Sequence, residues 1–169
     1  MKIDDFVTYV HRKEDKVYLR TKLLPVSIRL FHSSPQYKHI VLQICRYIEF
    51  LALSKPDDYK LPHGMSGANT AIPFNIIGYV KDRDKSTATC IIMINPEIVF
   101  DNDELIETES NCGSIRLEKP IKIKRLAKIK VNYFDETGTE HCEWFDRNNG
   151  SFTIQHEIDH NNGVLITDY

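Results

Sequence analysis

Two histidines four positions apart form the strongest chemical signal in the sequence. Residues 156–160 read His-Glu-Ile-Asp-His. On an α-helix, residues four apart lie on one face, one turn from each other, so His156 and His160 could bind the same metal ion. Glu157 would sit beside them, placed for proton transfer. The alternative is a pair of histidines and an acid on a solvated helix face, and the pattern favours metal binding over it.

A catalytic metal site normally has a third protein ligand and an open position for water. The nine residues after His160 contain no His, Glu or Cys, and Asp168 is the sole acid among them. Gly163 fits the longer pattern H-E-x-x-H-x-x-G-x-x-H, but the last position of that pattern is Ile166, which cannot bind a metal. We therefore expect the third ligand to lie upstream of the two histidines.

The chain also has four widely spaced cysteines, with no C-x-x-C pair among them: Cys45, Cys90, Cys112 and Cys142. In a reducing compartment they should be thiols. Most free cysteines are small buried hydrophobic residues, so at most one or two of the four should have a chemical role.

Length and composition fit one globular domain over residues 1–169, with 41% hydrophobic and 27% charged residues. The formal net charge of −2 gives no global argument for binding nucleic acid or an anionic membrane. No apolar run approaches the roughly 18 residues of a membrane helix. Asp4 and Asp5 stand where a signal peptide would be basic and then apolar, so we expect a cytoplasmic protein.

Two helices are predicted, one towards each end of the chain. Ser34 can cap free amide groups, and Pro35 suits the first helical position because its missing N–H costs nothing there. Apolar residues then recur at helical spacing, and residues 55–58, which read Lys-Pro-Asp-Asp, should end this helix near residue 54. The histidines lie in the second helix, expected over residues 151–162 with Gly163 as its C-terminal cap.

Strands are predicted between these helices from alternating apolar residues and turn residues. The candidate strands are 76–80, 90–94, 97–100, 105–109, 128–134 and 140–145. Asn95 and Pro96 should close the second of them, and residues 135–138 read as a hairpin turn. Residues 1–33 read as short extended pieces and turns, and residues 61–75 as a structured loop. The order of helix, strands and helix predicts an α+β fold.

Seven basic residues lie between positions 116 and 130: Arg116, Lys119, Lys122, Lys124, Arg125, Lys128 and Lys130. A nucleic-acid patch is one interpretation. Because these residues nearly alternate with apolar ones, we interpret them instead as the solvent-facing side of β-strands.

Residues 155–168 closely resemble the C-terminal motif of the peptide deformylases. The third ligand of that family is a cysteine in an E-G-C-L-S motif, about forty residues upstream. Residues 110–114 read Ser-Asn-Cys-Gly-Ser, and Cys112 precedes His156 by 44 residues. The first motif of the family, G-x-G-x-A-A-x-Q, falls on residues 64–71. The resemblance covers roughly residues 35–169.

The sequence departs from the family in two motifs. The acid two places before the cysteine is Ser110 here, with Glu109 one step further away. In the family that acid pairs with an arginine that matches Arg125, and a Glu109–Arg125 pair would need a local shift of the chain. The catalytic glutamine of the first motif falls on Ala71, and Asn69 is a nearby amide that could replace it. Losing one oxyanion donor can lower a rate by about 10²–10³-fold.

The resemblance implies an α+β fold of mixed or antiparallel sheets, packed around a C-terminal metal-binding helix and accompanied by an additional N-terminal helix. It implies that Cys112, His156 and His160 hold one divalent cation, with Fe²⁺ as the native metal and Zn²⁺ or Ni²⁺ able to occupy the site. Water would take the fourth place, Glu157 would act as general base and then acid, and the N–H of Gly113 would stabilise the oxyanion.

By the same resemblance, the substrate is the N-formyl group on the N-terminal methionine of a new polypeptide. The methionine side chain would enter a pocket lined by Met65, Phe152, Thr153 and His156. The backbone around Ser66 would pair with the substrate main chain. The substrate contacts expected from the resemblance are therefore Gly64, Met65, Ser66, Asn69, Phe152 and Thr153.

Two other functions stay open at this stage. A zinc peptidase would use the same histidines and Glu157, with Asp168 or another acid as third ligand. A catalytically weakened descendant would bind peptide N-termini around a structural metal, and Ala71 supports that alternative. For the leading hypothesis we expect a monomer whose partners are N-formyl-methionyl chain ends, without direct binding to membrane or nucleic acid.

Overall fold

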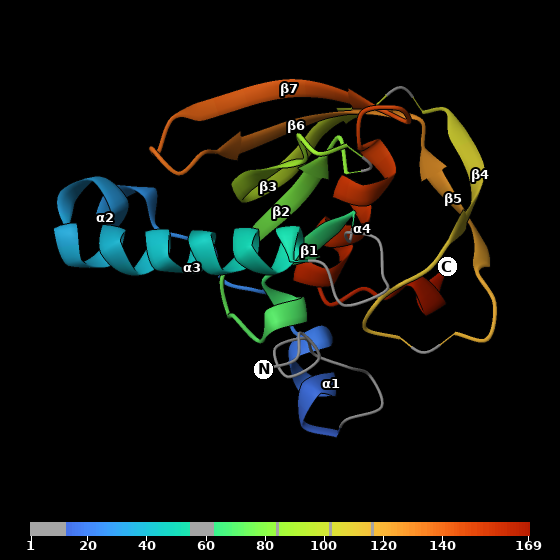
Figure 1. Ribbon diagram of the computed structural model, residues 1–169, viewed down its shortest axis with the longest axis horizontal. Helices are drawn as coiled ribbons and strands as arrows, with labels where there is room; N and C mark the ends of the chain where they lie inside the picture. The colour runs from blue at the N-terminus through green and yellow to red at the C-terminus, as the bar shows by residue number, and fades with distance from the viewer. Residues whose placement is uncertain (1–12, 55–62, 84, 102, 116) are drawn as a thin grey trace.

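A computed structural model describes residues 13–54, 63–83, 85–101, 103–115 and 117–169 (Figure 1). Its α-helices are α1 (Lys13–Leu19), α2 (Ile28–Ser33), α3 (Pro35–Leu53) and α4 (Ser151–Asn161). Its strands are β1 (Gly64–Ser66), β2 (Ile76–Lys81), β3 (Thr89–Asp101), β4 (Leu105–Ser110), β5 (Ile121–Leu126), β6 (Lys128–Phe134) and β7 (Glu140–Asp146). Two 3₁₀ turns, η2 (Ala68–Thr70) and η3 (Ile166–Asp168), complete the elements.

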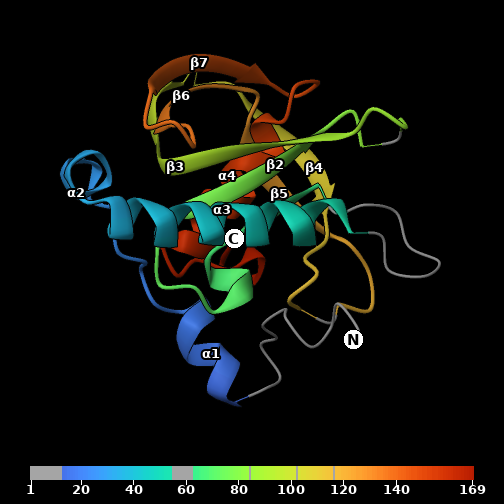
Figure 2. The same cartoon turned by 60° about the vertical axis from the view of Figure 1, so that its left-hand side comes forward.

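The main sheet has five strands in the order β1-β2-β3-β6-β7, and every neighbouring pair is antiparallel. Successive side chains of a strand point to opposite faces. In β2, Ile76 and Val80 pack with α3, whereas Ile77 and Tyr79 pack with α4. The two long helices therefore cover opposite faces of the sheet (Figures 1 and 2). Burial on both faces explains why β2 reads as a continuous apolar run rather than an alternating one.

A second, two-stranded sheet is formed by β4 and β5, and it lies beside α4 (Figure 1). Ile123 of β5 packs with Cys112 and with Ile166 of η3 in a small core of its own. This small core fixes the chain that follows β4, and that chain carries Cys112.

The structure confirms the expected long helix, because α3 spans Pro35–Leu53 and the Ser34 hydroxyl accepts a hydrogen bond from Tyr37 N. Residues 55–58, expected to end it, lie outside the described residues. The interpretation of the N-terminal region was wrong where that region is described. Residues 13–19 and 28–33 are helical, the second helix begins at a Ser27 cap, and it buries Phe31. These short helices gain most of their stability from packing, which the sequence pattern did not reveal.

The expected break at Asn95 and Pro96 was also wrong, because β3 runs through both residues to Asp101. The register against β6 shifts between Ile94 and Glu97, so the two residues form an irregularity within one strand. Asn95 has φ 53°, and its side-chain amide accepts from Val26 N and donates to Val26 O. A tertiary contact therefore holds the conformation that the sequence suggested would end the strand.

The remaining elements largely follow the sequence pattern. The predicted strands 76–80, 105–109, 128–134 and 140–145 correspond to β2, β4, β6 and β7, each within one residue at either end. The hairpin turn is held by Asp135, whose carboxylate accepts from the N–H groups of Thr137 and Thr139. The loop expected over 61–75 contains the short strand β1 and the turn η2, and β5 was not assigned a strand of its own. No helix of the described chain has the length and apolar character needed to cross a bilayer.

Gly163 ends α4 in the left-handed conformation expected of a C-terminal cap, with φ 76°. A Cβ at this position would lie 2.7 Å from the carbonyl oxygen of Arg20, which is backbone and cannot easily move. We predict that Gly163→Ala destabilises the fold by about 1–2 kcal/mol from the backbone conformation alone. The melting temperature, measured by circular dichroism, should fall by several degrees.

The matched control is Gly113→Ala, because a Cβ there meets no atom within 4 Å. Gly113→Ala should not lower the melting temperature. Equal melting temperatures for Gly163→Ala and the unmodified protein would contradict the proposed cap.

Candidate metal centre

Helix α4 is anchored at both ends, and these anchors decide which way its histidines point. At its start, the Ser151 hydroxyl and the Gln155 amide both donate to Leu126 O, and Gln155 Oε1 accepts from Leu126 N at 3.0 Å. At its end, Asn161 donates to Asn75 Oδ1 and to Ile76 O, at 2.9 and 3.2 Å. The apolar side chains of Ile154 and Ile158 face the sheet. The opposite flank of the helix therefore turns towards the Cys112 loop.

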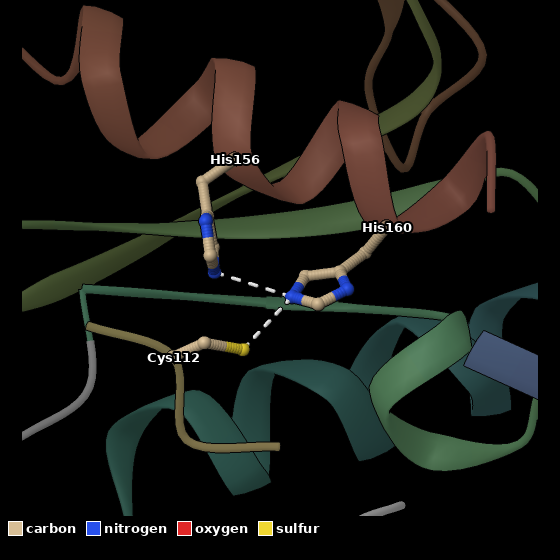
Figure 3. Close-up of side chains that lie close together, drawn as sticks. All are labelled: Cys112, His156 and His160. Carbon is tan, nitrogen blue, oxygen red and sulfur yellow. Dashed lines mark hydrogen bonds between the residues drawn. The ribbon is translucent and has the colours of Figure 1, made fainter. Parts of the chain in front are cut away.

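Three donor atoms converge in the space between α4 and that loop (Figure 3). The Nε2 atoms of His156 and His160 lie 3.2 Å apart, and Cys112 Sγ lies 3.2 Å from His160 Nε2. All three donor atoms lie within 4.8 Å of one another. In the described part of the chain this is the one cluster of His, Cys, Asp or Glu with metal-binding geometry.

These separations fit a tetrahedral metal ion. With metal–sulfur bonds of about 2.3 Å and metal–nitrogen bonds of about 2.0–2.1 Å, tetrahedral angles place nitrogen ligands about 3.3 Å apart and sulfur about 3.5 Å from nitrogen. One thiolate and two imidazoles suit Fe²⁺, Zn²⁺ or Ni²⁺. The residues present therefore fit a divalent cation, and the predicted ligands Cys112, His156 and His160 are the ones that the fold brings together.

Burial sets the protonation of the two imidazoles. Desolvation, with the positive charges of Arg125 and His63 added, lowers the pKa of His156 to about 4. Desolvation and the neighbouring His156 and Arg125 lower the pKa of His160 to about 3. Both imidazoles are therefore neutral at pH 7, which is the form that binds a metal.

Burial acts in the opposite direction on the sulfur, because it disfavours the thiolate. Desolvation raises the pKa of the Cys112 thiol to about 12, and the charge of Glu157 adds to the shift. Hydrogen bonds from the N–H groups of Ser114 and Ile115, and with the Ser114 hydroxyl, oppose it. Since only the thiolate is a good ligand, binding a cation here must displace the thiol proton.

Glu157 lies beside the cluster in a water-excluded position, 4% exposed. Desolvation raises the pKa of its carboxyl to about 8, while a hydrogen bond with Ser66 and the charge of Arg125 oppose the shift. Among the described residues, Glu157 Oε2 has no hydrogen-bond partner although it is buried. A buried carboxylate oxygen left unpaired next to a metal-binding cluster is placed to accept a proton from a small molecule.

Arg125 supports α4 from the side of β5, and its contacts correct one expectation. Glu109 lies opposite Lys122 in the β4–β5 ladder, so no shift brings it to Arg125. Arg125 is instead buried against α4, where its Nη1 donates to Asp159 and to the hydroxyl of Tyr169. The Tyr169 hydroxyl in turn donates to Asp159 at 2.7 Å. Two residues that sequence reasoning had not paired with Arg125 thus bind it, and neither carries a local sequence signal.

The predicted substrate residues come from β1, η2 and the first turn of α4. Gly64 packs against Glu157 and Thr153, since a Cβ there would lie 2.8 Å from Glu157 Cγ and 2.9 Å from Thr153 Cγ2. Met65 is buried in the α3 core, and Phe152 is partly buried. The pocket for a methionine side chain stays a prediction.

The side chain of Asn69 is held within the protein. Its Nδ2 donates to Ser114 Oγ at 2.8 Å, and its Oδ1 accepts from Ser66 N at 3.0 Å. Ala71, at the position of the family glutamine, is left-handed with φ 55°.

Other candidates from the sequence lie away from the cluster. Cys45 is buried in the α3 core, Cys90 is partly buried and Cys142 is exposed, as expected for residues without a chemical role. Asp168 pairs with Arg20 and accepts from Leu165 N, so the alternative third ligand is not at the site.

The seven basic residues between positions 116 and 130 were interpreted as the solvent-facing side of β-strands, and the structure agrees in part. Lys122 and Lys124 alternate outward along β5, whereas Arg125 is buried. Arg116 lies outside the described residues.

The geometry of one thiolate and two imidazoles beside a buried glutamate can now be compared with known proteins. The family model for polypeptide deformylase matches residues 59–169. This chain belongs to the polypeptide deformylase family. The match includes all three predicted ligands, Glu157 and the whole of the first motif.

Curated peptide deformylases align with part of the chain. The protein from Afipia carboxidovorans is 33% identical over 108 residues, which cover 63% of this chain and 61% of that protein. The protein from Desulfotalea psychrophila is 39% identical over 87 residues, covering 52% of this chain and 50% of that protein. The aligned segment thus spans about half to three fifths of the length of these relatives.

Solved deformylase structures share the fold over nearly the whole chain. A class I type b peptide deformylase from Acinetobacter baumannii, bound to Met-Ala-Ser, has a TM-score of 0.73 and 20% identity, and the match covers 96% of this chain and 97% of that one. A probable peptide deformylase from Synechococcus phage S-SSM7 has a TM-score of 0.71 and 20% identity, with 96% and 97% covered. These structures confirm the predicted α+β fold, with antiparallel sheets and a C-terminal helix.

We predict that metal affinity rises with pH, because the cluster must lose protons to bind a cation. The Cys112 thiol, with its pKa near 12, is protonated from pH 6 to pH 8 and loses one proton on binding. The imidazoles, with pKa values near 4 and 3, lose none. Glu157, with a pKa near 8, adds at most one more. Zinc affinity can be measured by competition with a chromophoric chelator. It should rise about tenfold per pH unit if binding releases one proton and about a hundredfold if it releases two.

Cys112→Ser is the control for this prediction. It should weaken zinc binding and remove one proton from the pH dependence. A slope of three protons would show that the histidines are charged, and a slope of zero would show that the sulfur is not a ligand.

Proposed function

We propose that this protein hydrolyses the N-formyl group from the N-terminal methionine of newly made polypeptides, with Fe²⁺ as its native metal. Membership of the deformylase family supports the reaction. The single observation that carries it is the cluster of Cys112, His156 and His160 beside a buried Glu157 with an unpaired oxygen. Binding of Met-Ala-Ser to the Acinetobacter protein of the same fold supports an N-terminal methionine in the substrate.

Cys112, His156 and His160 would hold the cation, which when bound would supply the Lewis acidity that lowers the pKa of water and polarises the formyl carbonyl. The protein contributes the positions of the groups around the reacting atoms. A water oxygen attacks the formyl carbon, Glu157 takes the proton released, and the carbon–nitrogen bond then breaks. Glu157 delivers that proton to the leaving amine, so formate and a free N-terminus are the products.

Glu157 must be ionised to act as a base, and a cation held by the cluster would favour that form. Burial, opposed by Ser66 and the charge of Arg125, raises its pKa to about 8. A positive charge held by Cys112 and the histidines would draw that pKa downwards and favour the carboxylate at pH 7. Its unpaired Oε2 would then accept the proton without first breaking a hydrogen bond.

The chain next to Cys112 is open on the side where a substrate would approach. Gly113 is exposed, and a Cβ at this position meets no atom within 4 Å. We propose its N–H as the donor to the oxygen of the tetrahedral intermediate. The extended β1 strand, with Met65 and Ser66, would pair with the main chain of the peptide.

The first test is Glu157→Gln, assayed for formate release from a formyl-methionyl peptide with Fe²⁺ under anaerobic conditions. The amide cannot take a proton, so kcat should fall by about 10²–10⁴-fold. Metal content should be unchanged because Glu157 is not a ligand. Glu109→Gln, at an exposed position of β4, should keep full activity.

Formyl-methionyl peptides that stay intact with the Fe²⁺-loaded unmodified protein would overturn the proposed function. Undiminished turnover by Glu157→Gln would overturn the role of Glu157.

The second test is Gly64→Ala, which displaces the Glu157 side chain without substituting Glu157 itself. The new methyl group would come within 2.9 Å of both Glu157 Cγ and Oε1, closer than real Cβ contacts allow, so the carboxylate must move. A catalytic group displaced by a fraction of an ångström loses much of its effect. We expect kcat to fall at least about tenfold, with metal content retained, and a kcat equal to that of the unmodified protein would contradict this packing.

A further inference from the structure

Three buried polar side chains form a chain of hydrogen bonds between the β1–η2 segment and the loop that carries Cys112. Ser66 follows Met65 in β1, Asn69 lies in η2, and Ser114 lies two residues after Cys112. Their exposed fractions are 0%, 6% and 1%. Asn69 Oδ1 accepts from both Ser66 N, at 3.0 Å, and Ser66 Oγ, at 2.5 Å, while Asn69 Nδ2 donates to Ser114 Oγ at 2.8 Å.

Each end of this chain reaches a group of the site. The N–H and hydroxyl of Ser114 form hydrogen bonds with the Cys112 sulfur. At the other end, the Ser66 hydroxyl acts on the pKa of the Glu157 carboxyl, although its proton is donated to Asn69 Oδ1. The loop that carries the sulfur ligand is thus joined to β1 by hydrogen bonds through Asn69.

Among the described residues, apolar packing and one internal backbone bond also hold the Cys112 loop. Its internal backbone bond runs from Ile115 N to Cys112 O at 3.2 Å, and the apolar contacts of Cys112 are with Ile123 and Ile166. Apolar contacts are not directional, whereas the hydrogen bond from Asn69 of η2 holds Ser114 in one orientation. The amide of Asn69 is therefore a directional tie between this loop and the first motif.

The alternative role for Asn69 is that of oxyanion donor, in place of the glutamine that falls on Ala71. Its amide group is already committed to Ser114, and its carbonyl oxygen is held by two groups of Ser66. Releasing the amide towards a substrate would leave Ser114 Oγ buried and unpaired, at a cost of about 1–3 kcal/mol.

We propose that Asn69 is a positioning residue, which holds Ser114 and so orients the Cys112 sulfur towards the two imidazoles. Its effect on turnover rests on the proposed function, but its effect on the metal site does not. Partners that orient a ligand in this way typically change metal affinity by about 10–100-fold when removed.

The test uses Co²⁺ as a probe of the metal-loaded protein, because a cobalt–thiolate bond has a charge-transfer absorption that reports sulfur ligation. Asn69→Ala and Ser114→Ala should each weaken Co²⁺ binding about 10–100-fold and reduce or shift the thiolate band. The double variant should be no weaker than either single variant, since both remove the same tie. Ser114→Ala, which removes one hydroxyl, keeps the test available if Asn69→Ala does not fold.

The matched control is Thr70→Val, in the same turn. The Thr70 hydroxyl is buried and donates to Gly67 O at 3.0 Å, without contact with the Cys112 loop. Thr70→Val should lower the melting temperature but leave Co²⁺ affinity and the thiolate band unchanged.

Two results would overturn the proposal. If Asn69→Ala lowers kcat while Co²⁺ affinity and the thiolate band stay unchanged, Asn69 is an oxyanion donor. If Asn69→Ala and Thr70→Val both lower only the melting temperature, Asn69 is structural. Unchanged Co²⁺ affinity and thiolate band in Asn69→Ala would overturn the proposal even if no formate is released, so failure of the proposed function is distinguishable.

Discussion

The structure depends on bringing one sulfur and two imidazole nitrogens together in a largely buried place, where Cys112 and His160 are buried and His156 is partly exposed. Each of these groups pays for burial, as the raised pKa of Cys112 and the lowered pKa values of His156 and His160 show. A cation bound by all three would offset that cost, because it favours the thiolate and uses the lone pairs of the neutral imidazoles. Metal binding and folding of this region are therefore expected to stabilise each other.

Rigid elements hold the two halves of this cluster in place. Helix α4 is tied to Leu126 through Gln155 at one end and to β2 through Asn161 at the other. The sulfur comes from a loop, and that loop is fixed by the small core around Ile123. The difference matters because a helix presents two ligands with fixed spacing, whereas a loop ligand needs separate restraints to find its position.

The departures from the family motifs lie where this chain has contacts of its own. Ser110 stands at the position of an acid, and Arg125 finds its carboxylate on Asp159 of α4, together with the Tyr169 hydroxyl. Asn69 stands within a motif that lacks its glutamine, and its amide joins Ser66 to Ser114 by hydrogen bonds. Both arrangements supply hydrogen bonds to buried side chains around the same cluster, although Arg125 Nη2 has no partner among the described residues.

Features that local chemistry controls could be predicted from the residues alone. The cap at Ser34, the left-handed Gly163, the hairpin at Asp135 and the histidine pair on one helix face all follow from short-range geometry. Cys112 was found through its resemblance to a family motif, since its spacing from the histidines would not identify it alone.

Features that depend on distant partners became evident only once the chain was seen folded. Asn95 continues β3 because Val26 binds its side chain, and α1 and α2 are helical because they pack on the rest of the protein. The partners of Arg125 and Asn69 come from residues 34 and 45 positions away, and no local pattern encodes which buried polar groups will meet. Such pairs form because an unpaired polar group is costly inside the core, and the fold alone settles which partner lies within reach.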